Sequence, residues 1–285
     1  MVNVVFAMPA IILLVTLSLY PIYILLRMAF SEVGVQNLLG VWQANGFQNF
    51  IAVLSDPAFQ AVTVQTLIFV AGVMIFTLVA GFVMAMILRP ATRLNAATQT
   101  MMIFVWALPP VVVGSLWKFL LTSNGPVNAI LVGSHVAPLP IPFLSQPQTS
   151  LFSIAVVTVW VGIPFAVLVL KSAILDIPLE LWDAAKIDGA RQMQTVWFIV
   201  LPAIRPTLYI LGVLSVVGAF KGFDFIYVMT VGGPGTSSST IPFFGYLAAF
   251  QSYQFGAAAA ISVFAMIMVL ALAVAYIIAV RREER

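Results

Sequence analysis

The sequence predicts an all-α polytopic membrane protein, a bundle of six transmembrane helices with a short cytoplasmic helix between the fourth and fifth. Two observations carry this prediction. Hydrophobic residues make up 62% of the chain and charged residues only 7%, which excludes a soluble globular protein. A polar segment, residues 172–203, separates two of the apolar stretches. We expect one domain covering residues 1–285.

Six apolar stretches are long enough to cross a hydrocarbon core, which needs about 20 residues of helix. An even number of spans places both termini on the same side of the membrane. The first stretch lacks a basic n-region and is too long for a removable signal peptide, so we expect it to remain as a helix. The predicted spans are Val4–Leu26, Leu67–Leu88, Met101–Leu121, Leu151–Leu170, Thr207–Met229 and Ala257–Val280.

The distribution of Lys and Arg predicts the orientation, because these residues favour the cytoplasmic side. With segment 172–203 inside, the outer loops 31–58, 123–150 and 231–253 contain no Lys or Arg. Both termini are then cytoplasmic. The inner basic residues are Arg89, Arg93, Lys171, Lys186, Arg191, Arg205, Arg281, Arg282 and Arg285, while Arg27, Lys118 and Lys221 lie near outer ends of spans.

Prolines inside the predicted spans should kink or break their helices, since each removes a backbone donor. Two interpretations are open: a gated pathway passing Pro110 and Pro164, or curvature that serves packing alone. The prolines concerned are Pro9, Pro21, Pro109, Pro110 and Pro164.

The polar segment should begin with a short helix. Pro178 suits a first helical turn and Glu180 complements the helix dipole there. The helix should run to about Ile187 and end at Gly189 in a left-handed conformation. Its apolar face is predicted to consist of Leu181, Ala184 and Ala185.

After this helix, Pro202 and Pro206 are expected to turn the chain back into the bilayer. Acidic and basic residues balance in the segment, whereas a lipid-surface anchor would carry a basic excess. Local rules alone leave an ordinary interfacial re-entry helix as an alternative.

The spacing in this segment resembles the Glu-Ala-Ala loop of the transmembrane subunits of type I ATP-binding-cassette importers. Asp for Glu at position 183 is the departure from that pattern. The resemblance implies a coupling helix that docks on a cytoplasmic ATPase subunit. The matching residues are Asp183, Ala184, Ala185, Gly189, Ile199, Leu201 and Pro202, and Asp188 is included in the predicted coupling site.

A second resemblance, covering nearly the whole chain, is to carbohydrate-uptake permeases of the maltose and glycerol-3-phosphate type, the first of their two subunit types. The motifs that carry it are Tyr20-Pro21, Gly46-Phe47-Gln48-Asn49-Phe50, Asp56-Pro57-Ala58-Phe59, Phe223 to Gly235, Thr240 and Phe255 to Ser262.

This resemblance implies a permease subunit of an ATP-driven sugar importer in a prokaryotic cytoplasmic membrane. Its partners would be a second permease subunit, two ATPase subunits and an extracytoplasmic solute-binding protein. ATP and Mg would bind the ATPase subunits, with no cofactor on this chain. The sequence agrees, because it contains no Gly-x-x-x-x-Gly-Lys-Ser/Thr loop, and one histidine without cysteine makes a poor metal or catalytic site.

Candidate pathway residues are the ionisable groups within spans, which are costly unless they face a cavity or a partner. Lys118, Lys221 and Asp224 qualify. Lys221 and Asp224 are also spaced to pair on one helix face, which would make them structural. Trp117 and Tyr227 offer flat surfaces to a sugar ring, or they belong to an interfacial aromatic belt.

A neutral mono- or oligosaccharide is the expected substrate, since no Arg fork suited to phosphate lies in any span. The alternatives are a glycerol-3-phosphate or polyol-phosphate importer, an ion-coupled secondary transporter, and a structural membrane protein. A secondary transporter would call for paired carboxylates or inverted repeats. Asp224 is the only acid within a predicted span, and no second half repeats the first.

Overall fold

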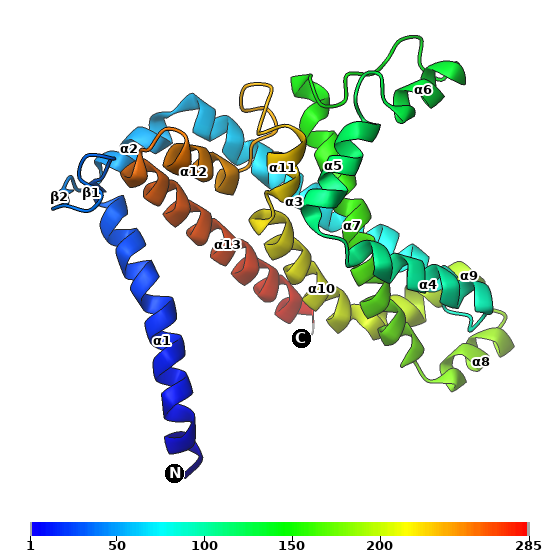
Figure 1. The fold of residues 1–285 in the computed structure, drawn as a ribbon. Helices are drawn as coiled ribbons and strands as arrows, with labels where there is room; N and C mark the ends of the chain where they lie inside the picture. The colour runs from blue at the N-terminus through cyan, green and yellow to red at the C-terminus, as the bar shows by residue number, and fades with distance from the viewer. Residues whose placement is uncertain (1, 284–285) are drawn as a thin grey trace. The chain divides into compact units, whose positions relative to one another are not determined.

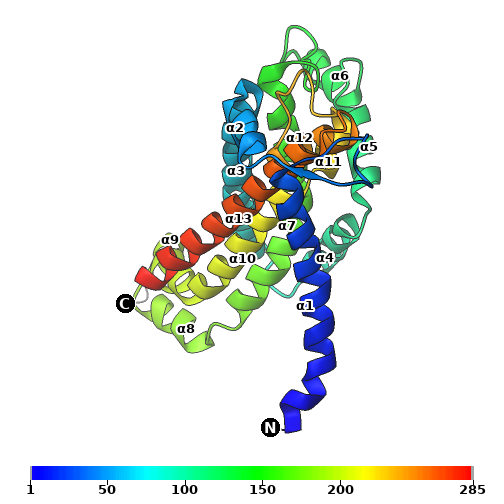
Figure 2. The same cartoon turned by 90° about the vertical axis from the view of Figure 1, so that its left-hand side faces the viewer.

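The computed structural model describes the backbone from Val2 to Glu283, and the side chains of Met8, of residues 13–272, and of Val274 and Ile278. The described chain is mostly helical (Figures 1 and 2). It forms two compact units. One contains the chain up to Val64 together with Thr240–Met268, and the other contains Gln65–Ser239 with the chain from Val269 onward. The single domain stays a prediction.

The first unit joins the two ends of the sequence. Strands β1 and β2 pair antiparallel, with Ser31 opposite Ala44 and Glu32 opposite Gln43. Helices α3 and α13 begin here and continue into the second unit. The elements are α1 (Val2–Ala29), β1 (Ser31–Glu32), β2 (Gln43–Ala44), α2 (Gln48–Ser55), the start of α3 (Pro57–Ile87), α12 (Ile241–Phe250) and the start of α13 (Phe255–Glu283).

Asn49 organises this unit. Its side-chain amide donates to the carbonyls of Ala29 and Ser31, each at 2.9 Å. The first residues of α13 approach the same place, where the Gly256 N–H donates to the Val33 carbonyl at 3.1 Å. A Cβ at position 256 would lie 2.7 Å from the Ser31 carbonyl oxygen, so only glycine fits.

The second unit holds the helices that carry the predicted site. In Figure 1, α7 lies beside α4 and α10, and both pairs are in contact. Its remaining elements are α4 (Arg93–Trp106), α5 (Pro110–Leu120), α6 (Pro126–Gly133), α7 (Pro147–Leu175), α8 (Leu179–Ile187), α9 (Gln192–Thr195), the π-helix η1 (Val196–Val200), α10 (Leu201–Lys221) and α11 (Asp224–Met229).

Four helices in the described part of the chain are long and apolar enough to cross a membrane, or five if the bent pair α4 and α5 counts as one span. The four are Pro57–Ile87, Pro147–Leu175, Gln192–Met229 and Phe255–Leu272. The first predicted span falls on α1, of which Leu13–Ala29 is a shorter apolar helix. A mostly helical fold with several apolar helices long enough to cross a membrane is therefore confirmed, while the count of six spans stays a prediction.

Two of the predicted spans are interrupted. The third is bent by 99° between α4 and α5, where Pro109 and Pro110 remove successive backbone donors. This confirms the expected effect of the two prolines. The fifth is interrupted for two residues, Gly222 and Phe223, between α10 and α11, although Gln192–Met229 still counts as one span. Pro164, by contrast, lies inside the uninterrupted helix α7.

Helices α3 and α7 approach closely through a small-residue contact. A Cβ at Gly81 would lie 2.5 Å from the Cβ of Ala166. Small residues allow such backbone approach in membrane proteins, where apolar burial gives little net attraction between helices. This contact belongs to a buried cluster that also includes Ala85, Leu170, Ile174, Ile177, Trp182, Val200, Ile204 and Leu211.

The predicted outer loop 123–150 contains more structure than its turn residues indicate. The fully buried Asn128 on α6 donates to the carbonyls of Thr122 and Ile141 and accepts from the Ile141 N–H. A single side chain thereby ties the loop together. In the loop after α11, buried Ser238 donates to the Gly233 carbonyl at 2.7 Å.

Candidate functional site

The predicted short helix in segment 172–203 is present as α8. It begins at Leu179, directly after Pro178, and Glu180 lies in its first turn. Pro178 is therefore the N-cap, one position before the predicted first turn, and its missing N–H removes no hydrogen bond of the helix. The carboxylate of Glu180 lies near the positive end of the helix dipole.

Gly189 ends α8 as expected. Its φ of +71° is in the left-handed region, and two hydrogen bonds close the turn: Gly189 N–H to the Lys186 carbonyl at 3.1 Å, and Ala190 N–H to the Ala185 carbonyl at 2.9 Å. This pair of bonds is the Schellman motif. A Cβ at 189 would meet no atom within 4 Å, so glycine is favoured here by conformation and not by crowding.

The predicted apolar face of α8 is wrong in one respect. Ala185 and Trp182 are buried, whereas Ala184 and Leu181 are exposed. Because Trp182 and Ala185 are three residues apart, they share one face. On this face Trp182 belongs to the chain's own buried core. Ala184 consequently lies on the outward side with Ile187, which is 86% exposed.

Trp182 is held by a residue that follows α3. The guanidinium carbon of Arg89 lies 3.5 Å from the centroid of the Trp182 ring. Such a cation–π contact is worth about 0.5–2 kcal/mol, with the larger value where water is excluded. The contact connects the end of α3 directly to the inward face of α8.

Asp183, the residue that departs from the Glu-Ala-Ala pattern, pairs with Lys186 on the same helix at 2.9 Å. Both side chains are exposed, so the pair adds little stability. The outward face thus combines a small residue, exposed apolar side chains and a local ion pair.

The chain after α8 does not turn at its prolines. A helix begins at Gln192 and continues through η1 into α10, with Pro202 and Pro206 inside it. The π-helix gives the physical reason. There the Leu201 N–H bonds to the carbonyl of Val196, five residues back instead of four. The hydrogen-bonding pattern of the helix thus shifts by one residue just before Pro202, which has no N–H to donate. Ile199 packs against the buried cluster.

A cavity of about 260 Å³ lies between α3, α7 and α10, beside the break between α4 and α5. Its polar lining consists of Thr77, Thr158, Ser215 and Asp224. Asp224 is the only ionisable residue among those that line it. We call this space the central cavity.

Thr77 is the unusual residue of the central cavity. Its side chain is buried, at 5% exposure, and its hydroxyl has no hydrogen-bond partner. The Thr158 hydroxyl, in contrast, donates to the carbonyl of Ile154 at 2.8 Å. An unpaired buried hydroxyl costs about 1–3 kcal/mol, and a passing polar molecule would supply the missing partner. Trp106 and Phe165 line the same cavity and stack at 5.6 Å.

The other predicted pathway residues lie elsewhere. Lys118 donates to the carbonyl of Val228 at 3.0 Å, joining α5 to α11. Trp117 packs edge-on against Trp160 at 5.5 Å, and Tyr227 is 47% exposed. Among the described residues that line the central cavity, Asp224 is the only one of the five candidates.

The alternative that Lys221 pairs with Asp224 is wrong. Lys221 ends α10 and Asp224 begins α11, with Gly222 and Phe223 between them. The spacing of three residues brings side chains together only within one continuous helix. Both side chains are exposed, and the structure shows no ion pair between them.

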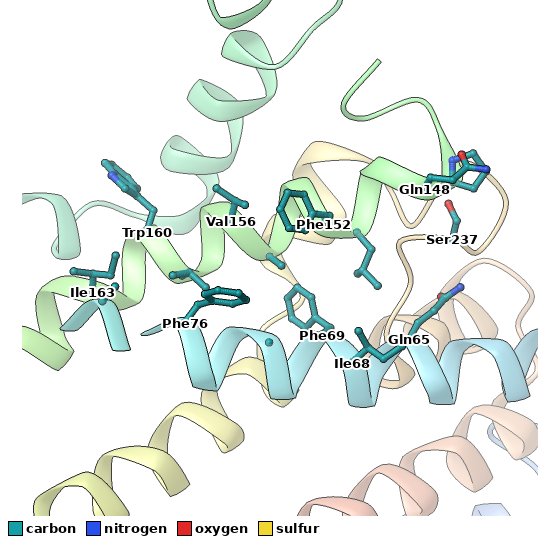
Figure 3. A pocket seen from close by; sticks show the side chains of 16 residues that line it. Gln65, Ile68, Phe69, Phe76, Gln148, Phe152, Val156, Trp160, Ile163 and Ser237 are labelled. Atoms are coloured by element: carbon teal, nitrogen blue, oxygen red, sulfur yellow. The ribbon is translucent and has the colours of Figure 1, made fainter. Parts of the chain in front are cut away.

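Two further grooves lie along α3. Figure 3 shows the first, about 650 Å³ between α3 and α7. Gln65, Gln148 and Ser237 lie toward one end, while Phe76, Trp160 and Ile163 lie toward the other. The second groove, about 790 Å³, lies between the last part of α3 and the helix that starts at Gln192. We call these the neutral groove and the cationic groove, since Arg191 lines only the second.

Sequence reasoning missed Thr77, Trp106 and Trp182. Thr77 carries a sequence signal, because a hydroxyl in the middle of an apolar span needs a partner. Trp182 also carries one, since a large aromatic residue inside a polar segment is costly to leave in water. Trp106 has no comparable signal, because its position depends on the bend at Pro109.

Comparison with known proteins gives a consistent result. Residues 77–284 match the family described as "Binding-protein-dependent transport system inner membrane component". The diacetylchitobiose uptake system permease protein DasB of Streptomyces coelicolor is 29% identical over 90% of this chain and 80% of its own. The trehalose/maltose transport system permease protein MalF of Thermococcus litoralis is 30% identical, over 81% and 78%. The sn-glycerol-3-phosphate transport system permease protein UgpA of Agrobacterium fabrum is 32% identical, over 80% and 77%.

Solved structures share the fold. A chain of a bacterial ABC transporter involved in the import of the acidic polysaccharide alginate superposes with a TM-score of 0.81, at 24% identity over 98% of this chain and 95% of that one. A chain of the MetNI methionine ABC transporter, in an inward-facing conformation, gives a TM-score of 0.58 at 19% identity, over 82% and 98%.

Proposed function

Because the chain belongs to the family of inner-membrane components of binding-protein-dependent transport systems, we propose that it is one of two permease subunits that together enclose the pathway of an ATP-driven sugar importer. It spans the membrane six times with both termini in the cytoplasm. An extracytoplasmic solute-binding protein delivers the sugar, and two ATPase subunits supply the energy.

The observation that carries this proposal is the division of α8 into two faces. Trp182 packs in the chain's own core and Ala185 is buried on the same face, which leaves Ala184 and Ile187 outward. Exposed apolar side chains around a small residue suit close contact with another protein. We assign this outward face to the ATPase subunit.

A neutral sugar is the proposed cargo. The lining of the central cavity supplies hydroxyls and the stacked ring of Trp106, groups that suit a polyhydroxylated ring. Its only charge is the carboxylate of Asp224, which would repel a phosphate ester. The relatives DasB and MalF are named for neutral sugars and UgpA for a phosphate ester, so the carboxylate favours the first class.

The test replaces Ala184 with Asp in the complete transporter. A charge that becomes buried and unpaired in an interface costs several kcal/mol, so we expect at least a tenfold loss of ATPase subunit retained on purification. Sugar-stimulated ATP hydrolysis should fall with it. The measurement is the ratio of ATPase to permease subunits after detergent purification.

Two variants serve as controls. Ala184→Ser keeps the residue small and should retain the ATPase subunits. Ala185→Asp, at the buried neighbouring position, should instead impair folding of the permease itself, seen as loss of a symmetric gel-filtration peak. Full ATPase retention and activity in Ala184→Asp would overturn the assignment of the outward face of α8 to the ATPase subunit. A wild-type protein that retains no ATPase subunit would overturn the proposal that the chain belongs to an ATP-driven importer.

A further inference from the structure

The cationic groove combines an apolar trough with one charged residue. From α3 it is lined by apolar residues such as Val79, Val83 and Ile87, and from the facing helix by Val196 and Trp197. Between Leu78 and Ile87, α3 rises about 14 Å, which is about half of a ~30 Å hydrocarbon core. The trough therefore has the length of one leaflet.

Arg191 is the only charged residue that lines this groove. It is exposed, and within the described part of the chain no carboxylate lies within 4.0 Å of its guanidinium. Its charge is therefore free to meet an anion from outside the chain.

The position of Arg191 at the start of a helix also indicates that its charge meets an anion outside the chain. It immediately precedes Gln192, at the N-cap position, where Ser, Thr, Asp and Asn are favoured because their side chains accept from the first N–H groups. An arginine cannot accept, and its positive charge opposes the helix dipole. The main-chain N–H of Arg191 donates to the Gln194 side chain at 2.7 Å, but its guanidinium makes no ion pair within the described part of the chain. A charge that opposes the local rules in this way indicates a partner outside the chain.

We propose that the cationic groove binds an anionic phospholipid, with one acyl chain along Val79 and Val83 and the phosphate at Arg191. The neutral groove of Figure 3 gives the contrast. It is also apolar along most of its length, but its polar residues, Gln65, Gln148 and Ser237, carry no charge. The two grooves along α3 thus differ in the charge of their polar lining.

The test uses the fluorescence of Trp197, which lines the cationic groove and is 62% exposed. The transporter in mixed micelles receives phosphatidylglycerol or phosphatidylcholine with brominated acyl chains, which quench nearby tryptophan. Subtracting the signal of Trp197→Phe isolates this residue. We expect phosphatidylglycerol to quench with about fivefold higher apparent affinity, the effect of one basic residue on an anionic lipid.

Arg191→Gln should abolish this preference, while Arg93→Gln, a similarly exposed arginine outside the groove, should keep it. Val83→Phe should fill the trough without adding a tryptophan, and should reduce quenching of Trp197 by both lipids. Equal quenching by the two lipids in the wild type, or equal loss in Arg191→Gln and Arg93→Gln, would overturn the proposal. Efficient cross-linking of Val83→Cys to a partner subunit in native membranes would overturn it too, because protein would then cover the groove.

Discussion

Trp182 determines which side of α8 faces the rest of the chain. The small residues Ala184 and Ala185 predict a narrow face, but the free energy of burying a large ring outweighs that of burying a methyl group. Including Trp182 in the periodicity would have placed Ala185 inward and Ala184 outward. The partner Arg89 could not be predicted, because that contact joins segments far apart in the sequence.

At the same scale, Thr77→Val tests the central cavity. Valine has nearly the shape of threonine but lacks the unpaired hydroxyl, so the variant should be as stable as the wild type or more stable, by up to about 1–3 kcal/mol. If the hydroxyl bonds to passing sugar, uptake should fall severalfold. Thermal unfolding of the purified transporter and uptake of radiolabelled sugar measure the two effects.

Thr158→Val is the matched control, since its hydroxyl lines the same cavity but already donates to the carbonyl of Ile154. Thr158→Val should lose stability, and sugar uptake should change less than in Thr77→Val. A Thr77→Val transporter with unaltered uptake would show that the cavity is not on the sugar's route.

Among the elements, a break in a helix can be predicted from the sequence where a proline causes it directly. A break without a proline cannot be predicted in this way. Pro109 and Pro110 predict the bend between α4 and α5 from the missing donors alone. The break at Gly222 has no such signal, because a single glycine is tolerated inside many membrane helices. The turn predicted at Pro202 and Pro206 is wrong. A π-helix directly precedes Pro202, and Pro206 lies inside the helix α10.

The contact between α3 and α7 gives a prediction for a pair of glycines on one helix. Gly81→Ala places a methyl group within 2.5 Å of the Ala166 Cβ, whereas a Cβ at Gly72 would meet no atom within 4 Å. The first substitution should destabilise the protein by about 1–3 kcal/mol, and the second should be nearly neutral. Thermal unfolding in detergent compares them; equal melting temperatures would contradict the close packing of these helices.

For the whole molecule, composition and hydrophobic length predicted a helical membrane fold because the bilayer leaves few alternatives. The motifs in the first unit were visible in the sequence, but their role was not. Only the folded chain brings Asn49, Ser31 and Gly256 together. The grooves along α3 depend likewise on how helices pack, which hydropathy does not record.

The proposed topology can be tested on a chain that has no cysteine of its own. Ser134 and Ile187 are both exposed, so single cysteines there should differ in labelling only by the side of the membrane. An impermeant maleimide should label Ser134→Cys in intact cells and Ile187→Cys only after solubilisation and unfolding. Labelling of position 187 alone in intact cells would invert the topology.

The stacking of Arg89 on Trp182 has a mechanical consequence. Since the inward face of α8 contacts Arg89 just after α3, the proposed docking of an ATPase subunit on Ala184 would act on α3 directly. The same helix carries Thr77, which lies about 15 Å by helical rise from its last residue, Ile87. Under the proposed docking, one helix would therefore connect α8 to the wall of the central cavity, which Thr77 lines.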